Sequence, residues 1–132
     1  MPNSVAQDIV TLLSDNALGT IGTDLFGMQW GDAIDAQTLV IETGGVDTEN
    51  KEQYEQPTFQ ILVRGVKQGA INTLYATIKS IHEFLIEQPE LVTINTTDYL
   101  GFEPVSGINP LGRDDNNRFV YSSNYFTYRN PN

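Results

Sequence analysis

Apolar residues recur at helical spacing in two stretches of the chain. Near the start they predict an amphipathic helix over residues 4–14, ending at Gly19, where a left-handed residue costs little. Its apolar face holds Val5, Ile9, Leu12 and Leu13. A longer pattern persists for about five turns and predicts a helix from about residue 67 to 88, stopped by Pro89. Its apolar face holds Ile71, Leu74, Tyr75, Ile78, Ile81, His82 and Leu85.

Alternating apolar and polar positions predict strands in the rest of the chain. Gly44 and Gly45 are expected to end one of them, because paired glycines favour turns. The stretch "SGINPLGRDDNNR", residues 106–118, is expected to form turns rather than a strand. The strands are expected at about residues 26–30, 38–45, 57–65, 91–96 and 118–129.

The order of these elements is a helix, two or three strands, a long helix and then two strands. This order predicts the α+β class, with a mostly antiparallel sheet of about four to five strands and both helices packed on one face. Neither a linker nor an internal repeat interrupts the chain, so residues 1–132 are expected to form a single domain. Residues from about 44 to 56 are dense in Asp, Glu, Asn and Gln and are expected to form a polar acidic loop.

The composition narrows the classes of function. With 17 acidic and seven basic residues, the formal net charge is −10, which repels phosphate and disfavours nonspecific nucleic-acid binding. The chain has no cysteine, so disulfides and thiolate metal sites are excluded. The first residues lack a targeting pattern, and no apolar run approaches the roughly 20 residues that cross a bilayer. We therefore expect no membrane association.

The residues with catalytic potential form no recognisable site. His82 is the only histidine, and its place on the apolar border of the long helix predicts a packed side chain. The glycines lack the spacing of a phosphate-binding loop, and "RDDNN" lacks the full ligand pattern of a calcium loop. We therefore expect no metal, no cofactor and no catalytic residue, and predict that the chain is not an enzyme.

Large aromatic residues occupy both faces of the last predicted strand. One face carries Phe119, Tyr121 and Tyr125, and the other carries Val120, Phe126 and Tyr128. A sheet covered by helices on one side needs apolar residues only on that side. The second face is therefore covered either by another subunit or by a terminal arm or loop of the same chain.

Four segments in one order resemble the tail-terminator proteins of long-tailed bacteriophages, also called tail-completion, neck or minor capsid proteins. They are "IGTDLFGMQWGD", "LVIETGG", "PTFQILVRG" before the long helix, and "PLGRDDNNRFVYSSNYFTYR" at the end. The resemblance runs from about residue 5 to residue 129. The region "MQWGDAIDAQ" departs from the proline-containing turn expected in such proteins.

The resemblance implies a structural virion protein of the tail or neck, assembled in the host cytoplasm. Such a protein forms a homohexameric ring that caps the head-proximal end of the tail tube, ends tube polymerisation and joins the tail to the head connector. Its implied partners are copies of itself, the tail tube protein and the head–tail connector or adapter, while DNA passes through the channel without specific binding. Two alternatives stay open: a head-completion, connector-adapter or baseplate subunit, and a small α+β enzyme or ligand-binding domain with a pocket.

A cation ends the central strand of this acidic chain. Arg64 follows the alternation of "QPTFQILV", and the segment from Glu42 to Glu55 just before that strand carries five acids. Arg64 forms either a surface ion pair, worth at most about 1 kcal/mol, or a contact with carboxylates of a neighbouring subunit. An acidic channel would be contradicted if Arg64, Arg113 and Arg118 lined it. The candidate interface residues are Arg64, Glu42, Asp47, Glu49, Glu52, Arg113, Tyr121 and Tyr125.

Overall fold

The computed structural model describes residues 4–32, 36–46 and 55–130. These residues form an α+β fold, as the order of the predicted elements indicated. In chain order its elements are α1 (Val5–Asp15), β1 (Leu25–Gly27), β2 (Gln37–Val46), β3 (Gln56–Lys67), α2 (Ile71–Ile86), β4 (Val92–Ile94), β5 (Thr97–Tyr99), β6 (Glu103–Arg113) and β7 (Arg118–Phe126).

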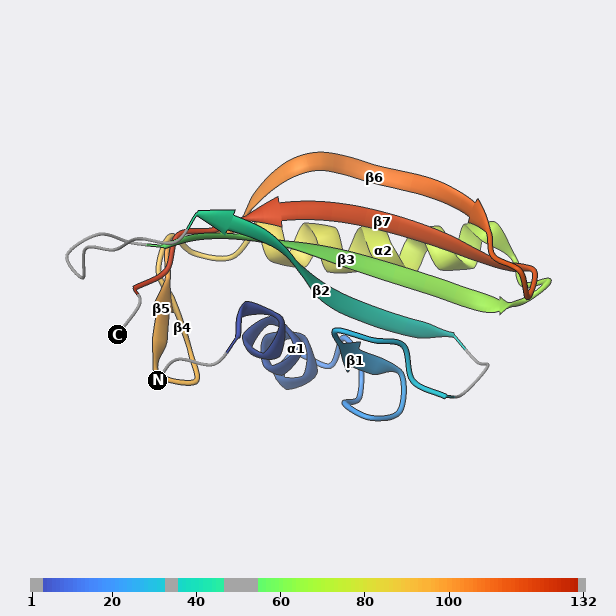
Figure 1. Ribbon diagram of the computed structural model, residues 1–132, viewed down its shortest axis with the longest axis horizontal. Coiled ribbons are helices and arrows are strands. Elements are labelled where there is room, and N and C mark those ends of the chain that lie inside the picture. Colours follow the sequence, from blue (N-terminus) through green and yellow to red (C-terminus); the bar gives the residue numbers. More distant parts are fainter. Residues whose placement is uncertain (1–3, 33–35, 47–54, 131–132) are drawn as a thin grey trace.

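Five of the described strands form one sheet in the order β1-β2-β3-β7-β6. Every neighbouring pair is antiparallel except β1 and β2, which are parallel. Figure 1 shows β6 along one long edge of the sheet and β1 along the other. The strands β4 and β5 form a separate two-stranded hairpin beside it. The predicted class and the mostly antiparallel sheet are confirmed.

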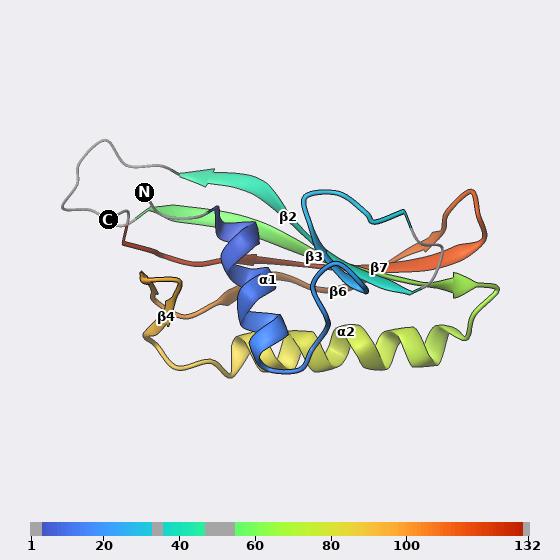
Figure 2. The same ribbon diagram turned by 90° about the horizontal axis from the view of Figure 1, so that it is seen from below.

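Both helices pack on one face of this sheet. Figure 2 shows α2 running along that face, with α1 crossing the sheet near its β1 edge. Alternate residues of β3 point toward the helices, and Phe59, Ile61 and Val63 are buried with apolar side chains of α1 and α2 in one core. Each fully buried side chain of this size contributes about 1.5–3 kcal/mol to folding. The shared core confirms the predicted placement of the helices.

The helix ends differ from the predictions by a few residues. Ser4 caps α1, its hydroxyl accepting the N–H of Gln7, but α1 ends at Asp15, and the residue with a left-handed φ of 60° is Ala17, not Gly19. The long helix begins at Ile71 rather than near residue 67, because β3 continues to Lys67 and its ladder hydrogen bonds compete with the first helical turn.

The glycine pair predicts that the strand ends at Gly44 and Gly45, but the strand continues past both of them. β2 continues to Val46, with Gly45 paired to Pro57 just after the register shift between Glu42 and Gly44. A Cβ on Gly45 would lie 2.3 Å from the carbonyl oxygen of Gln56. The missing side chain therefore lets the two strands approach closely beside the bulge instead of turning the chain away.

The prediction of turns over residues 106–118 is wrong for most of that stretch. Residues 106–113 belong to the 11-residue strand β6. This strand tolerates Pro104 and Pro110 because it lies at the edge of the sheet and its register with β7 shifts. The turn is confined to residues 114–117, where the Asp114 carboxylate accepts the N–H groups of Asn116 and Arg118.

Two further strand predictions need correction. Residues 91–96 do not form one strand with a kinked continuation, because Asn95 and Thr96 have positive φ angles of 48° and 68° and turn the chain from β4 into β5. Tyr128 lies beyond the end of β7 and is exposed. Phe126 is therefore the aromatic residue that β7 itself presents on the face away from the helices.

Candidate assembly surfaces

Arg64 is buried within its own chain. It follows Val63, which faces the helices, so its side chain lies on the opposite face of the sheet. Only 4% of its surface is exposed, and its guanidinium carbon lies 4.3 Å from the centre of the Trp30 ring. Burial lowers the pKa of Arg64, and the charge of Arg118 acts in the same direction. A contact between Arg64 and a neighbouring subunit would require Trp30 to move aside.

Trp30 also bears on how the second face of the sheet is covered. Phe26 of β1 pairs with Leu39 of β2, which pairs with Leu62 of β3, so these three residues share the face that carries Arg64. Leu39 is buried although helices cover only the other face. At this end of the sheet, therefore, a loop of the same chain covers the second face.

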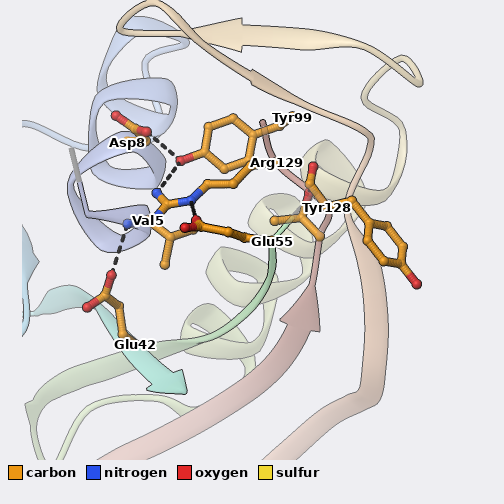
Figure 3. A network of polar contacts seen from close by, with 8 residues as sticks. Val5, Asp8, Glu42, Glu55, Tyr99, Tyr128 and Arg129 are labelled. Atoms are coloured by element: carbon orange, nitrogen blue, oxygen red, sulfur yellow. Dashed lines mark hydrogen bonds and ion pairs between the residues drawn. The ribbon is translucent and has the colours of Figure 1, made fainter. Parts of the chain in front are cut away.

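A polar network ties α1 to the hairpin and to the end of the chain (Figure 3). The hydroxyl of Tyr99 donates to the carboxylate of Asp8, and both side chains are fully buried. Arg129 donates from its Nη1 to the Tyr99 hydroxyl over 3.4 Å and from its Nε to Glu55 over 2.7 Å. Burial, and then the hydrogen bond to Asp8, raises the pKa of Tyr99 above its ordinary value. The network is built to hold elements together.

The acidic segment is anchored on both of its described flanks. Glu42 accepts the N–H of Val5 over 2.9 Å at the start of α1, where an anion is favoured by the helix dipole. Glu55 forms the ion pair with Arg129, whose pKa is raised by Tyr99 and Glu55 although burial acts in the opposite direction. Both acids therefore have partners inside the chain. Asp47, Glu49 and Glu52, the other predicted interface acids, lie outside the described residues.

The two predicted interface tyrosines are core residues of the single chain. Tyr125 has no exposed surface, stacks on Phe59 with ring centres 5.3 Å apart, and its hydroxyl lies 2.7 Å from Nδ1 of His82. Burial raises the pKa of Tyr125 to about 12. Tyr121 packs edge-on against Tyr75 of α2. His82 is half-buried, and its contact with Tyr125 agrees with the expectation of a packed side chain.

Arg113 differs from Arg64 because it is exposed. It donates to the carbonyl oxygens of Asn117 and Gly69 over 3.1 and 3.4 Å, and it lies over the ring of Phe119. These contacts hold it at the end of β6, on the open edge of the sheet. Of the two predicted interface cations, Arg113 is the one that is exposed in the folded chain.

Sequence reasoning missed two surfaces that carry exposed aliphatic side chains. One is the edge of β6, where Val105 and Leu111 are exposed, and the other is the pair of loops around β1, where Ile21 and Met28 are exposed. The glycines around Trp30 were a signal for the second surface. The sequence did not predict the β6 edge, because the residues of that stretch are typical of turns.

Comparison with known protein families decides the class of this chain. A family model described as bacteriophage tail terminator protein matches residues 12–128. The chain belongs to the bacteriophage tail terminator family. None of the curated proteins compared with it matches. As a tail terminator it is a structural component of the phage tail and so of the virion, and the resemblance noted from its sequence is confirmed.

The grouping of metal-ligating side chains, the length of the helices and the surface hollows further characterise the described part of this tail terminator. Within residues 4–32, 36–46 and 55–130, no three His, Asp or Glu side chains are grouped so as to hold a metal ion. None of the helices in that part is long and apolar enough to cross a membrane. A hollow of about 400 Å³ opens between α2 and the start of β2, and Thr38, Leu74 and Thr77 are among its lining residues.

Proposed function

We propose that this chain assembles into a closed ring of six copies at the head-proximal end of the phage tail tube. The ring caps the stack of tube subunits, ends their polymerisation and presents its other face to the head–tail connector. The observation that carries this proposal is the match to the tail terminator family over residues 12–128. Its action is contact between surfaces and not bond chemistry, in line with the sequence prediction that it is not an enzyme.

The acidic balance supports a channel through which DNA slides. Six copies with a net charge of −10 each carry about −60, and a negative wall repels the phosphate backbone and keeps DNA from adhering. Purified protein is expected to show no measurable affinity for duplex DNA at physiological ionic strength. Binding that weakens steeply with added salt would instead reveal a basic surface facing the channel.

The function is tested by omitting this protein during virion assembly in the host cytoplasm. Tails of uncontrolled length, or tails that do not join heads, are the expected products, and both are visible by electron microscopy. Restoring the protein in trans should restore tails of uniform length. Tails of normal length that join heads without the protein would contradict the proposal.

The position of the protein in the particle separates this role from that of other virion proteins. A tail terminator contacts the tail tube protein on one side and the connector or adapter on the other. Cross-linking in intact particles is therefore expected to recover both partners. Cross-links to the portal alone would indicate a head-completion or connector-adapter protein, and cross-links at the distal tip would indicate a baseplate subunit.

A further inference from the structure

The edge of β6 exposes aliphatic side chains that point away from the sheet. Val105 and Leu111 have 61% and 57% of their surface exposed, and the register with β7 shifts around each of them. Such an extra residue at a bulge turns its side chain out of the regular alternation. Pro104 and Pro110 lack N–H donors, which hinders pairing of this edge with another strand. A partner of this edge must therefore contact side chains.

The loops around β1, residues 20–24 and 28–32, form a hollow on the other edge of the sheet. Its volume is about 490 Å³, and Phe26 and Trp30 line it together with several glycines. A Cβ on Gly31 would lie 2.3 Å from the ring of Phe26, so the hollow depends on that missing side chain. Ile21 and Met28, both more than half exposed, belong to the same loops.

These β1 loops are held in place by hydrogen bonds to β2. Met28 donates its N–H to the carbonyl oxygen of Val40 over 2.8 Å, and Gly31 donates to Oε1 of Gln37 over 3.0 Å. Met28 has a φ of 70°, a left-handed conformation that is uncommon for a side chain of its size. A surface already fixed in shape loses little conformational entropy when a partner binds.

The two surfaces are complementary in shape and in charge. One presents protruding aliphatic side chains and ends at the exposed cation Arg113, whereas the other presents an aromatic hollow lined also by the exposed acid Asp32. A second exposed acid, Asp24, lies in the same loops but outside that hollow. They lie on opposite edges of the sheet, β6 on one side and β1 on the other (Figure 1). A closed ring of identical copies joins each copy to the next through two different patches.

We infer that the β6 edge of one copy docks into the β1 loops of the next copy around the ring. Val105 and Leu111 pack against Ile21, Met28 and the hollow that Phe26 and Trp30 line, and Arg113 faces the acids of those loops. This inference rests on the proposed ring and adds the surfaces that close it. The apolar contact supplies the affinity, and the charge pair sets the register of the two copies.

Cysteine cross-linking in assembled tails tests the contact, because the natural chain has no cysteine. The double variant Ile21→Cys/Leu111→Cys is supplied in trans to particles that lack the wild-type chain, and the tails are treated with a short bis-maleimide. A ladder of covalent oligomers of this chain is expected. The matched control is Ile21→Cys/Leu91→Cys, since Leu91 is 58% exposed but lies just before β4 and is not part of β6. It should remain monomeric.

Charge exchange provides a second measurement of the same contact. Arg113→Glu and Asp32→Arg, each supplied alone, should each weaken the contact between neighbouring copies by about tenfold, which corresponds to roughly 1.4 kcal/mol, and should therefore lower the yield of rings at tail ends. An equimolar mixture should restore rings. When the two variants alternate around an even-numbered ring, every second contact joins the two substituted positions with their charges exchanged, and the other contacts keep the natural pair. Glu90→Arg, a change at an exposed acid that belongs to neither surface, should have no effect.

The outcomes separate this inference from the proposed function. If wild-type tails carry a ring of this chain but the residue 21 and 111 cysteines do not link, or link no better than the control pair, the docking inference is wrong and the ring stands. Links from residue 111 to the tube protein instead of another copy overturn it equally. If wild-type tails carry no oligomer of the chain at all, the proposed ring itself is wrong.

Discussion

Arg64 and Trp30 form a cation–π pair on the face of the sheet opposite the helices. The guanidinium carbon lies 4.3 Å from the ring centre, and Arg64 is almost completely buried beneath the indole. Such pairs contribute about 0.5–1 kcal/mol when exposed and about 2 kcal/mol when desolvated. Arg64 does not end the central strand as the sequence predicted, because β3 continues to Lys67. Its contact with Trp30 is part of how the loop after β1 is held on the sheet.

Replacing Arg64 with glutamate is expected to destabilise the fold itself. A carboxylate beneath Trp30 would be desolvated and would face the negative side of the ring, so the free energy of unfolding should fall by about 3 kcal/mol or more. Arg64→Lys keeps the positive charge, so its free energy of unfolding should fall by less. Chemical denaturation of both variants checks this. A variant Arg64→Glu as stable as the wild type but unable to form rings would favour the intermolecular role predicted from the sequence.

Removing the hydroxyl of Tyr99 should weaken the junction between α1 and the β4–β5 hairpin. Tyr99→Phe leaves the buried carboxylate of Asp8 without its donor from that side chain, which costs about 1–3 kcal/mol. Tyr128→Phe serves as the control, because Tyr128 is exposed and lies outside this hydrogen bond. Thermal unfolding followed by circular dichroism should separate the two variants, and equal midpoints would contradict the structural importance of the network.

A methyl group on Gly45 should disrupt the pairing of β2 with β3. Gly45 has a φ of 112°, and its Cβ would collide with backbone atoms of Gln56 and Pro57. Gly45→Ala is therefore expected to lower the free energy of unfolding by about 2–3 kcal/mol. Gly107→Ala in β6, where a Cβ meets no atom within 4 Å, should change it little. Similar denaturation midpoints for the two variants would show that the β2–β3 pairing at Gly45 tolerates a side chain.

Stability should decline in strongly alkaline solution because of Tyr125. Its folded-state pKa is raised from 10.0 to about 12. Below pH 10 the hydroxyl of Tyr125 keeps its proton in the folded and the unfolded chain, and its contribution to stability is fully present. Between pH 10 and 12 the unfolded chain releases the proton while the folded chain keeps it, so the free energy of unfolding falls by up to about 1.4 kcal/mol per pH unit. Urea denaturation across this range should show a shallower decline for Tyr125→Phe, and identical slopes would contradict this assignment.

Much of the fold follows from local patterns in the sequence. The helical spacing of Leu74, Ile78, Ile81 and Leu85 persists long enough that only one secondary structure buries all four. The alternation of Phe59, Ile61 and Val63 likewise requires a strand with one buried face. The order of these elements then limits the architecture to helices on one face of a mostly antiparallel sheet, as observed.

The strand β6 could not be read from its own residues. Its prolines, glycines and asparagine are turn formers by local preference, and nothing apolar alternates along it. It is a strand because β7 supplies a ladder of hydrogen bonds along its length, while its bulges accommodate the residues that fit poorly. Tertiary pairing overrode local preference here, and it also placed Leu111 on an open edge.

The assignment of partners to charged residues depends on the folded chain as well. The acidic balance, the α+β class and the resemblance to tail terminators could all be established before folding was considered, because composition, periodicity and the order of segments are properties of the chain alone. Arg64 was left open to a surface ion pair or a subunit contact. Only the folded structure shows that Trp30 covers Arg64. It also shows that Glu42 accepts the N–H of Val5 and that Glu55 pairs with Arg129. The reason is physical: side chains far apart in sequence become neighbours only after the sheet and core have formed, and burial then determines which charges stay open to a partner.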